Sequence, residues 1–255
     1  MSDGDSCRLK YFEGEPEVLA EVRQMWDEIF DDPEEFADYY FTEICKQNKI
    51  LLAYKGDVLA GMIHLNPYEM QVEGKKELCY YIVGVAVKPE YREQGIMHKM
   101  MQRVLADMKK DGRAFAFLMP EREEYYESLG FEKVFHTLEL DIDIAELEDE
   151  NVVPDDLSGE EGYYTKNLKD LHEERADILE HLSGEVNEAL AKKYRIYAHR
   201  TPQYLEQMCM EHRCQNGDVV AVYEDGMHMD DGQVEELPLI HISEPTRHLR
   251  ISYAV

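Results

Sequence analysis

The chain has 255 residues, 44% of them hydrophobic, so it can bury one large core or two modest ones and is not a disordered chain. Its 55 acidic and 27 basic residues give a net charge of −28, which would repel a phosphodiester backbone and argues against a nucleic-acid partner. No apolar run reaches the roughly 18 residues of a membrane span, and the N-terminus lacks the features of a signal peptide, so we expect a cytoplasmic protein with no membrane partner.

The first half of the chain predicts an α/β domain, residues 1–145, with a mixed sheet and helices on both of its faces. Apolar residues recur at helical spacing from Glu17 to Phe30, and Asp31-Asp32-Pro33 begins a second helix that continues to Cys45. A hairpin follows across Lys55-Gly56-Asp57. The other predicted elements are a strand over 78–87, a helix over 96–110, a strand over 114–119, a helix over 121–129 and a strand near 134–144.

The second half predicts a linker and a partial second unit. Asp and Glu dominate residues 141–161, so we place an acidic linker at 146–160. Residues 161–238 echo part of the first domain, because Thr201-Pro202 begins a helix through Met210 and a strand over 219–223 leads to a Glu-Asp-Gly turn.

The last segment, residues 239–255, resembles a translated sequencing-library adapter. Residues 239–247 resemble the translation of a transposase mosaic end with its read primer, and residues 251–255 resemble a flow-cell adapter. A barcode-sized gap at 248–250 separates the two blocks. We therefore expect a non-native tail and a natural protein that continues beyond about Pro238.

The stretch from Val85 to Met97 carries the strongest functional signal. An apolar strand ends at Pro89, and a short loop containing Gly95 opens directly into a helix. The first N–H groups of a helix lack intrahelical partners and carry the positive end of the helix dipole, and glycine admits close approach. The pattern predicts a pyrophosphate site; the alternative is a helix start that uses Gly95 only for its backbone freedom.

Two motifs resemble the GNAT superfamily of acyl-CoA-dependent N-acyltransferases over roughly residues 9–144. The segment 92–97, Arg-Glu-Gln-Gly-Ile-Met, resembles the Arg/Gln-x-x-Gly-x-Gly/Ala signature, with Met97 where Gly or Ala is usual. The segment 126–131 resembles the Tyr-x-x-x-Gly-Phe motif that follows the fifth strand. Met97, together with residues 66–68 and 118–120, resembles the enhanced-intracellular-survival branch of aminoglycoside acetyltransferases, in which tandem GNAT-like domains are known.

The resemblance implies a mixed GNAT-type sheet flanked by helices, followed by a truncated second GNAT-like unit. It also implies an acetyl-CoA-dependent N-acetyltransferase that acts on a primary amine of a cationic small molecule, aminoglycoside-like or polyamine-like, which the acidic surface would attract. Backbone N–H groups of the 92–97 loop would hold the pyrophosphate, with Arg92 adding charge, while the strand end at 85–87 would meet the pantetheine and polarise the thioester. The expected cofactor-binding residues are Val85, Ala86, Val87, Arg92, Glu93, Gln94, Gly95, Ile96 and Met97.

Tyr126 is the expected catalytic residue. Its phenol, with a pKa near 10, stays protonated at pH 7 and can give a proton to the departing thiolate; the alternative is an aromatic core residue with Tyr125 exposed. An amine with a pKa of about 10.4 must also lose a proton, and the base is left open. The candidates are Glu121, Glu123, Glu124, His64 or a residue beyond the C-terminal break, with a solvated helix start as the alternative for the glutamates.

Five cysteines without a Cys-x-x-Cys pair indicate neither a disulfide framework nor a zinc site, so we expect no metal. Cys209 and Cys214 flank His212, a grouping that we attribute to packing. Two other functions remain open: a protein N-terminal or lysine acetyltransferase, and a non-catalytic acyl-CoA-binding or scaffold protein in which Met97 crowds the phosphate loop. The sequence leaves the acceptor open, as well as assembly into a homo-oligomer.

Overall fold

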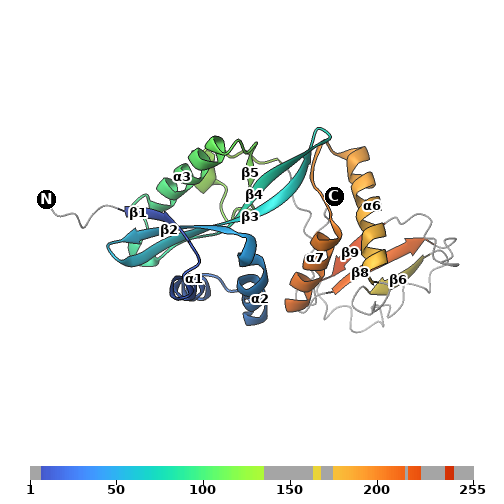
Figure 1. Cartoon of the computed structure of the whole chain (residues 1–255), viewed down its shortest axis with the longest axis horizontal. Helices are drawn as coiled ribbons and strands as arrows, with labels where there is room; N and C mark the ends of the chain where they lie inside the picture. The colour runs from blue at the N-terminus through green and yellow to red at the C-terminus, as the bar shows by residue number, and fades with distance from the viewer. Residues whose placement is uncertain (1–6, 135–162, 168–174, 216–217, 225–238, 244–255) are drawn as a thin grey trace. The chain divides into compact units, whose positions relative to one another are not determined.

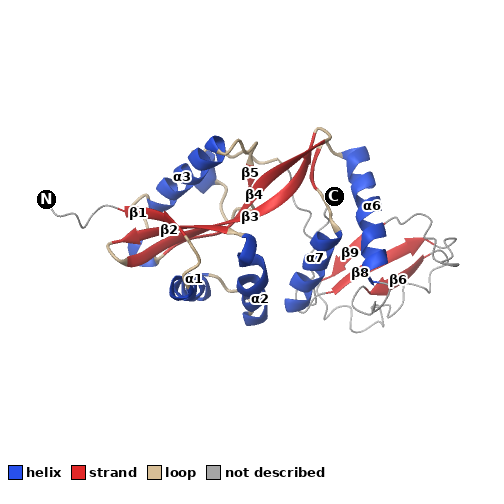
Figure 2. Cartoon of the chain, viewed as in Figure 1, coloured by secondary structure: helices blue, strands red, loops and turns tan. Residues whose placement is uncertain are grey.

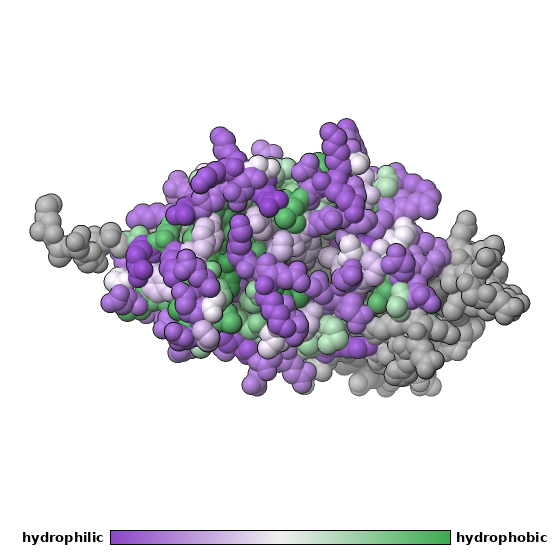
Figure 3. Space-filling view, viewed as in Figure 1, coloured by the Kyte–Doolittle hydropathy of each residue, from purple (hydrophilic) through white to green (hydrophobic). Residues whose placement is uncertain are grey.

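The chain divides into two compact units, Met1–Val134 and Phe135–Val255, in a computed structural model that describes residues 7–134, 163–167, 175–215, 218–224 and 239–243 (Figure 1). None of the described helices is long and apolar enough to cross a membrane. Hydrophilic residues predominate on the face seen in Figure 3, in keeping with the net charge of −28. The domain limits expected from the sequence stay predictions.

The first unit is built on a mixed sheet whose strands follow the order β1-β2-β3-β4-β5. The first four strands are antiparallel to their neighbours, and β5 runs parallel to β4. The β3–β4 turn places Glu73 and Gly74 at φ of 53° and 76°, as two-residue hairpin turns require. The strands are β1 (Cys7–Tyr11), β2 (Lys49–Lys55), β3 (Val58–Val72), β4 (Lys75–Val87) and β5 (Ala116–Phe117).

Helices cover both faces of this sheet (Figure 2). Helices α1 (Pro16–Ile29) and α2 (Glu34–Tyr39) lie on one face, and α3 (Ile96–Lys110) lies on the other. Helix α2 continues as a π-helical turn over Tyr40–Ile44 and a 3-10 turn over Cys45–Gln47, which fulfils the prediction of a helical segment to Cys45. The short α4 (Glu124–Glu127) follows β5.

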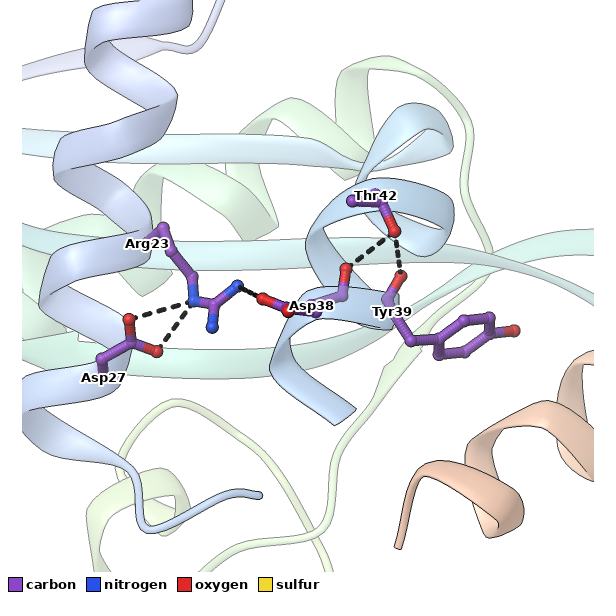
Figure 4. Close-up of polar contacts among 5 residues, drawn as sticks. All are labelled: Arg23, Asp27, Asp38, Tyr39 and Thr42. Atoms are coloured by element: carbon purple, nitrogen blue, oxygen red, sulfur yellow. Dashed lines mark hydrogen bonds and ion pairs between the residues drawn. The ribbon is translucent and has the colours of Figure 1, made fainter. Parts of the chain in front are cut away.

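Two hydrophobic clusters, one on each face, hold the layers together. On the α1 and α2 face, Trp26 stacks on Tyr40 with ring centroids 4.7 Å apart and meets Phe41 edge-on. On the α3 face, Met100, Met101 and other apolar side chains of the helix pack on alternate residues of the strands. Figure 4 shows that Arg23 of α1 also joins α2, because its guanidinium bonds both Asp27 and Asp38.

The second unit contains an antiparallel sheet in the order β6-β8-β9. The predicted helix at Thr201 is confirmed as α7, and the Thr201 side chain accepts a hydrogen bond from the Tyr204 N–H at 3.0 Å. The strand expected at 219–223 is confirmed within β8. Strand β9 lies in the segment that resembles an adapter, whose origin stays a prediction. The elements are β6 (Tyr163–Asn167), α6 (Arg175–Lys193), β7 (Ile196–Ala198), α7 (Pro202–Cys214), β8 (Asp218–Glu224) and β9 (Leu239–Ser243).

Several predicted bounds differ from the structure. The helix over 96–110 is confirmed, but the strand over 114–119 pairs only at Ala116–Phe117 and the helix over 121–129 is regular only at Glu124–Glu127. An apolar run predicts that a segment is buried, but it does not predict over how many residues the segment pairs with a neighbouring strand. For this reason β5 is shorter than the predicted strand. The strand expected near 134–144 and the linker fall outside the described residues.

Candidate active site

The loop from β4 to α3 is tightly folded. A 3-10 turn at Pro89–Tyr91 follows the strand, and the Lys88 N–H donates to the Ala60 carbonyl at 2.9 Å, which fixes the loop to β3. Glu93 and Gly95 both lie in the left-handed region, at φ of 60° and 71°. These two reversals turn the chain from the end of the strand directly into the helix.

The first turn of α3 presents backbone N–H groups without a side-chain cap. Gly95 is the N-cap residue, and the first helical hydrogen bond runs from the Lys99 N–H to the Gly95 carbonyl at 3.1 Å. The N–H groups of Ile96, Met97 and His98 precede that bond and have no partner within the helix. No acidic residue lies in this turn, and a Cβ built on Gly95 would meet nothing within 4 Å. The arrangement can accept an anion.

The polar side chains of the loop have structural contacts of their own. Arg92 is exposed, and its Nε donates to the Val87 carbonyl at 3.0 Å, so the side chain ties the loop back to the end of β4. Gln94 donates to the Glu90 carbonyl at 3.3 Å. Any contribution of Glu93 to anion binding must come from its backbone, because a carboxylate repels phosphate.

A β-bulge lies in β4 just before the loop. Met62 is opposite Ala86 and His64 is opposite Val83, so Gly84 and Val85 together face the single residue between them on β3. Gly84 has a φ of 60°, as expected for the glycine of a bulge. Ala86 is buried, while Val85 and Val87 pack on the α3-face cluster. The bulge therefore sets the direction of the strand end that was predicted to contact the cofactor.

β4 and β5 pair over a very short distance. Within residues 7–134, β5 pairs with β4 only at Tyr80–Ala116 and Tyr81–Phe117, although β4 continues to Val87. The two strands therefore part after Tyr81. An extended ligand can add along the edge of β4 beyond this point, as peptides do in β-augmentation.

Tyr126 is partly buried in α4, the helix that follows β5 in the chain. Its ring packs on the α3-face cluster and meets Phe131 edge-on at 5.9 Å, and its carbonyl accepts the N–H groups of Leu129 and Phe131. Burial, and then the carboxylate of Glu121, raise the pKa of Tyr126 above its usual value. The phenol is therefore protonated at neutral pH. Tyr125 is 54% exposed.

His64 is removed from the candidate bases. The side chain is fully buried on the α1 and α2 face, and burial lowers its pKa to about 3. Its Nδ1 lies 3.3 Å from the hydroxyl of Tyr40, and its Nε2 has no hydrogen-bond partner among the described residues. An imidazole that stays neutral down to pH 3 is too weak a base to take a proton from an ammonium group. The base remains unassigned.

The sequence analysis missed the bulge at Gly84 and an aromatic group formed by Tyr68, Tyr81 and Phe117. A glycine inside an apolar strand is a signal for a bulge and could have identified the first. The second joins three strands and has no local signal. Among the described residues, no group of three or more His, Cys, Asp or Glu side chains could hold a metal ion.

Comparison with known families identifies the first unit. Residues 13–134 match the family described as "Acetyltransferase (GNAT) domain". This segment is a GNAT acetyltransferase domain. The match confirms the expected fold and places the 92–97 loop and Tyr126 inside the GNAT domain. No curated protein matches the chain.

One solved structure that covers most of this chain has a similar fold. A probable N-acyltransferase of unknown function from Enterococcus faecalis V583 is 17% identical, with a TM-score of 0.68 over 94% of this chain and 56% of that one. The chain thus spans 56% of the length of that protein. A GNAT family acetyltransferase from Brucella melitensis in complex with acetyl-CoA is 20% identical over 49% of this chain and 84% of its own, with a TM-score of 0.41. An aminoglycoside acetyltransferase from an uncultured soil metagenomic sample is 18% identical over 51% of this chain and 95% of its own, with a TM-score of 0.42.

Proposed function

We propose that this chain is an acetyl-CoA-dependent N-acetyltransferase that transfers an acetyl group to a primary amine of a cationic small molecule. The observation that carries the proposal is the uncapped start of α3 at Gly95, which directly follows β4 where that strand parts from β5. A GNAT domain with this geometry offers both an anion site and a strand edge along which a pantetheine arm can lie.

The reaction needs few groups from the protein. The amine nitrogen attacks the thioester carbonyl, a backbone N–H of the 85–87 strand end stabilises the oxyanion, and collapse of the tetrahedral intermediate breaks the C–S bond. Tyr126 gives its proton to the departing thiolate and regains one from solvent. The amine loses its proton to a base that we leave unassigned, because the side chains of Glu121, Glu123 and Glu124 are all exposed.

The finer assignment concerns the acceptor. The likeness of residues 66–68, 97 and 118–120 to the enhanced-intracellular-survival branch favours an acceptor with several amino groups, such as an aminoglycoside or a polyamine. The net charge of −28 would concentrate such cations near the protein. A peptide N-terminus or lysine is the competing acceptor, and a panel of amines and peptides assayed by thiol release separates the two.

A pair of glycines on the same helix tests the phosphate site. Gly95 and Gly112 lie at the two ends of α3, have φ of 71° and 68°, and would each accept a Cβ with nothing within 4 Å. Gly95→Glu and Gly112→Glu therefore carry the same charge change and similar backbone strain. We expect Gly95→Glu to weaken acetyl-CoA binding about 10-fold or more by calorimetry, and Gly112→Glu to leave it unchanged. Equal affinities in the two variants, or no saturable binding to the wild type, would refute the site.

A further inference from the structure

The indole of Trp26 in α1 is held in one orientation. One face of the ring stacks on Tyr40, with ring centroids 4.7 Å apart, and Phe41 meets the ring edge-on at 5.6 Å. The indole N–H donates a hydrogen bond of 2.9 Å to the carboxylate of Asp32, which lies between α1 and α2. Because the side chain is only 3% exposed and its N–H is bonded, the ring has little freedom to turn.

This ring occupies the space beside Gly84 in β4. A Cβ built on Gly84 would lie 2.5 Å from Cζ3 and 3.3 Å from Cε3 of Trp26, and 3.2 Å from Cδ2 of His64. Both neighbouring side chains are buried, so neither can move aside into solvent. The bulge in β4 is therefore packed between α1 and β3, and it has no room to shift toward either of them.

The bulge sets the direction of the backbone that follows it. Pairing of β4 with β3 is regular up to Val83 and resumes at Ala86, so Gly84 and Val85 are the positions that lie out of register. A bulge bends its strand and increases the local twist. The direction of the Val85 amide therefore depends on the geometry of the bulge, and Val85 begins the 85–87 strand end that we propose polarises the thioester.

We propose that Trp26 is a positioning residue for acetyl transfer. Its indole, oriented by Asp32, holds the β4 bulge in the geometry from which the 85–87 strand end donates a hydrogen bond to the thioester oxygen. This inference rests on the proposed function and adds that the oxyanion donor depends on α1 and on the segment that follows it. Neither Trp26 nor Asp32 touches the reacting atoms. A small displacement of the donor matters because negative charge gathers on that oxygen as the carbonyl carbon becomes tetrahedral.

The carbonyl stretching frequency of a bound acyl group measures the hydrogen bond to its oxygen. The probe is an isotope-labelled ketone analogue of acetyl-CoA with a methylene group in place of the thioester sulfur, which cannot transfer its acyl group. Infrared difference spectra are recorded on the full chain. Trp26→Phe, which leaves a gap beside Gly84, should move the carbonyl band to higher frequency. The calorimetric affinity for the analogue should stay within about 3-fold of the wild type, because the contacts of the nucleotide and the pantetheine remain.

Asp32 offers a milder change with matched controls. Asp32→Ala removes the acceptor of the indole N–H and should move the carbonyl band in the same direction as Trp26→Phe, but by less. Asp32→Asn keeps a side-chain oxygen that can accept the same bond, so its band should stay at the wild-type frequency. Asp31→Ala removes the adjacent carboxylate, which is not the one that accepts the indole N–H, and it should also leave the band in place.

The outcomes separate the two proposals. If the analogue does not bind the wild type, the proposed function fails and the positioning role fails with it. If the analogue binds but Trp26→Phe and Asp32→Ala keep the wild-type band, only the positioning role is refuted. A shift in Asp31→Ala as large as that in Asp32→Ala would assign the effect to charge and would also overturn the inference, as would loss of analogue binding in a folded Trp26→Phe. If Trp26→Phe does not fold, the comparison of Asp32→Ala with Asp32→Asn decides.

Discussion

The backbone of Gly84 lies directly against the indole ring of Trp26, so that a Cβ built on Gly84 would stand 2.5 Å from Cζ3 of that ring. His64 of β3 packs against the same residue, because its Cδ2 would lie 3.2 Å from the Cβ built on Gly84. Trp26 belongs to α1, and Gly84 is the left-handed residue of the β4 bulge. The packing of α1 on the sheet thus supports the bulge, and through it the strand end expected to polarise the thioester.

Replacing Gly84 tests this contact. Gly84→Ala should lower the free energy of unfolding by about 2 to 4 kcal/mol, because the new methyl group collides with Trp26 in addition to the strain of a positive φ. Gly74→Ala in the β3–β4 turn also has a positive φ, but its Cβ meets nothing within 4 Å, so it should lose only about 1 kcal/mol. Urea denaturation of the two variants measures the difference.

A second substitution isolates the steric part of that loss. Trp26→Leu removes the ring that the methyl group would meet, so the combination of Gly84→Ala with Trp26→Leu should lose less than the sum of the single variants. Strict additivity, or equal losses for Gly84→Ala and Gly74→Ala, would show that the indole does not constrain the bulge.

The elements that the sequence predicted well have local signals. Helix α3 begins and ends where Gly95 and Asp111-Gly112 indicated, because its apolar spacing and both of its ends are encoded within the segment itself. The hairpin at Lys55-Gly56-Asp57 is local in the same way. By contrast, the extent of β5 depends on pairing with a strand far away in sequence and has no local signal. The bulge at Gly84 did have a local signal, a glycine inside the apolar run over 78–87, but the prediction did not use it.

The candidate site also combines features with local sequence signals and features set by distant parts of the chain. The loop that we propose binds phosphate could be singled out because strand, loop and helix are adjacent in sequence, and its Gly95 has a left-handed conformation in the structure. The exclusion of His64 as a base required knowledge of its complete burial, which is set by α1 and α2 as well as by its own strand. The grouping of Tyr68, Tyr81 and Phe117 could be found only from the pairing of β3, β4 and β5. Tertiary contacts, not local sequence, determine these features.

Arg23 connects α1 to α2, and this connection is testable. Its Nη1 lies 2.7 Å from Asp38, its Nε lies 2.8 Å from Asp27, and its guanidinium stands 5.4 Å from the ring of Phe41 (Figure 4). Asp38→Asn should lower the free energy of unfolding by about 0.3 to 1 kcal/mol, because Asp38 is largely exposed and water screens the pair. A double-mutant cycle with Arg23→Met measures the coupling, which should shrink in 1 M NaCl.

Arg103→Met provides the control for Arg23. Arg103 also pairs with an aspartate four residues on, Asp107, and lies over a ring, that of Tyr11, but it makes no contact with α2. Coupling between Arg103→Met and Asp38→Asn should be close to zero. A coupling as large as that of Arg23 would mean that the measured energy is a long-range charge effect and not the contact drawn in Figure 4.

The buried imidazole of His64 should make the stability of the GNAT domain depend on pH. In the unfolded chain its pKa is near 6.5, whereas burial lowers the folded value to about 3, so the unfolded state binds a proton that the folded state excludes. This contribution is complete above pH 6.5 and is lost as the pH falls toward 3. Relative to His64→Leu, the wild type should lose up to about 3 kcal/mol of unfolding free energy between pH 7 and pH 4.

Urea denaturation at pH 7, 5.5 and 4 checks this dependence. Subtracting the curve of His64→Leu cancels the carboxylates that both proteins share. His98→Leu on α3, a partly exposed position, should follow the wild-type curve. If the wild type and His64→Leu lose stability in parallel, His64 is either charged in the folded protein or hydrated.

Tyr126→Phe tests the assignment of the general acid. The change removes one hydroxyl and leaves the ring contact with Phe131, so folding and acetyl-CoA affinity should be retained. Thiol release at saturating acetyl-CoA should fall about 100- to 10,000-fold, the usual contribution of a positioned acid. Because burial raises the pKa of Tyr126, no loss of wild-type rate below pH 10 should come from its deprotonation. Tyr125→Phe, at the exposed neighbour, should keep the wild-type rate. An undiminished rate in Tyr126→Phe would mean that solvent or the acceptor ammonium protonates the thiolate.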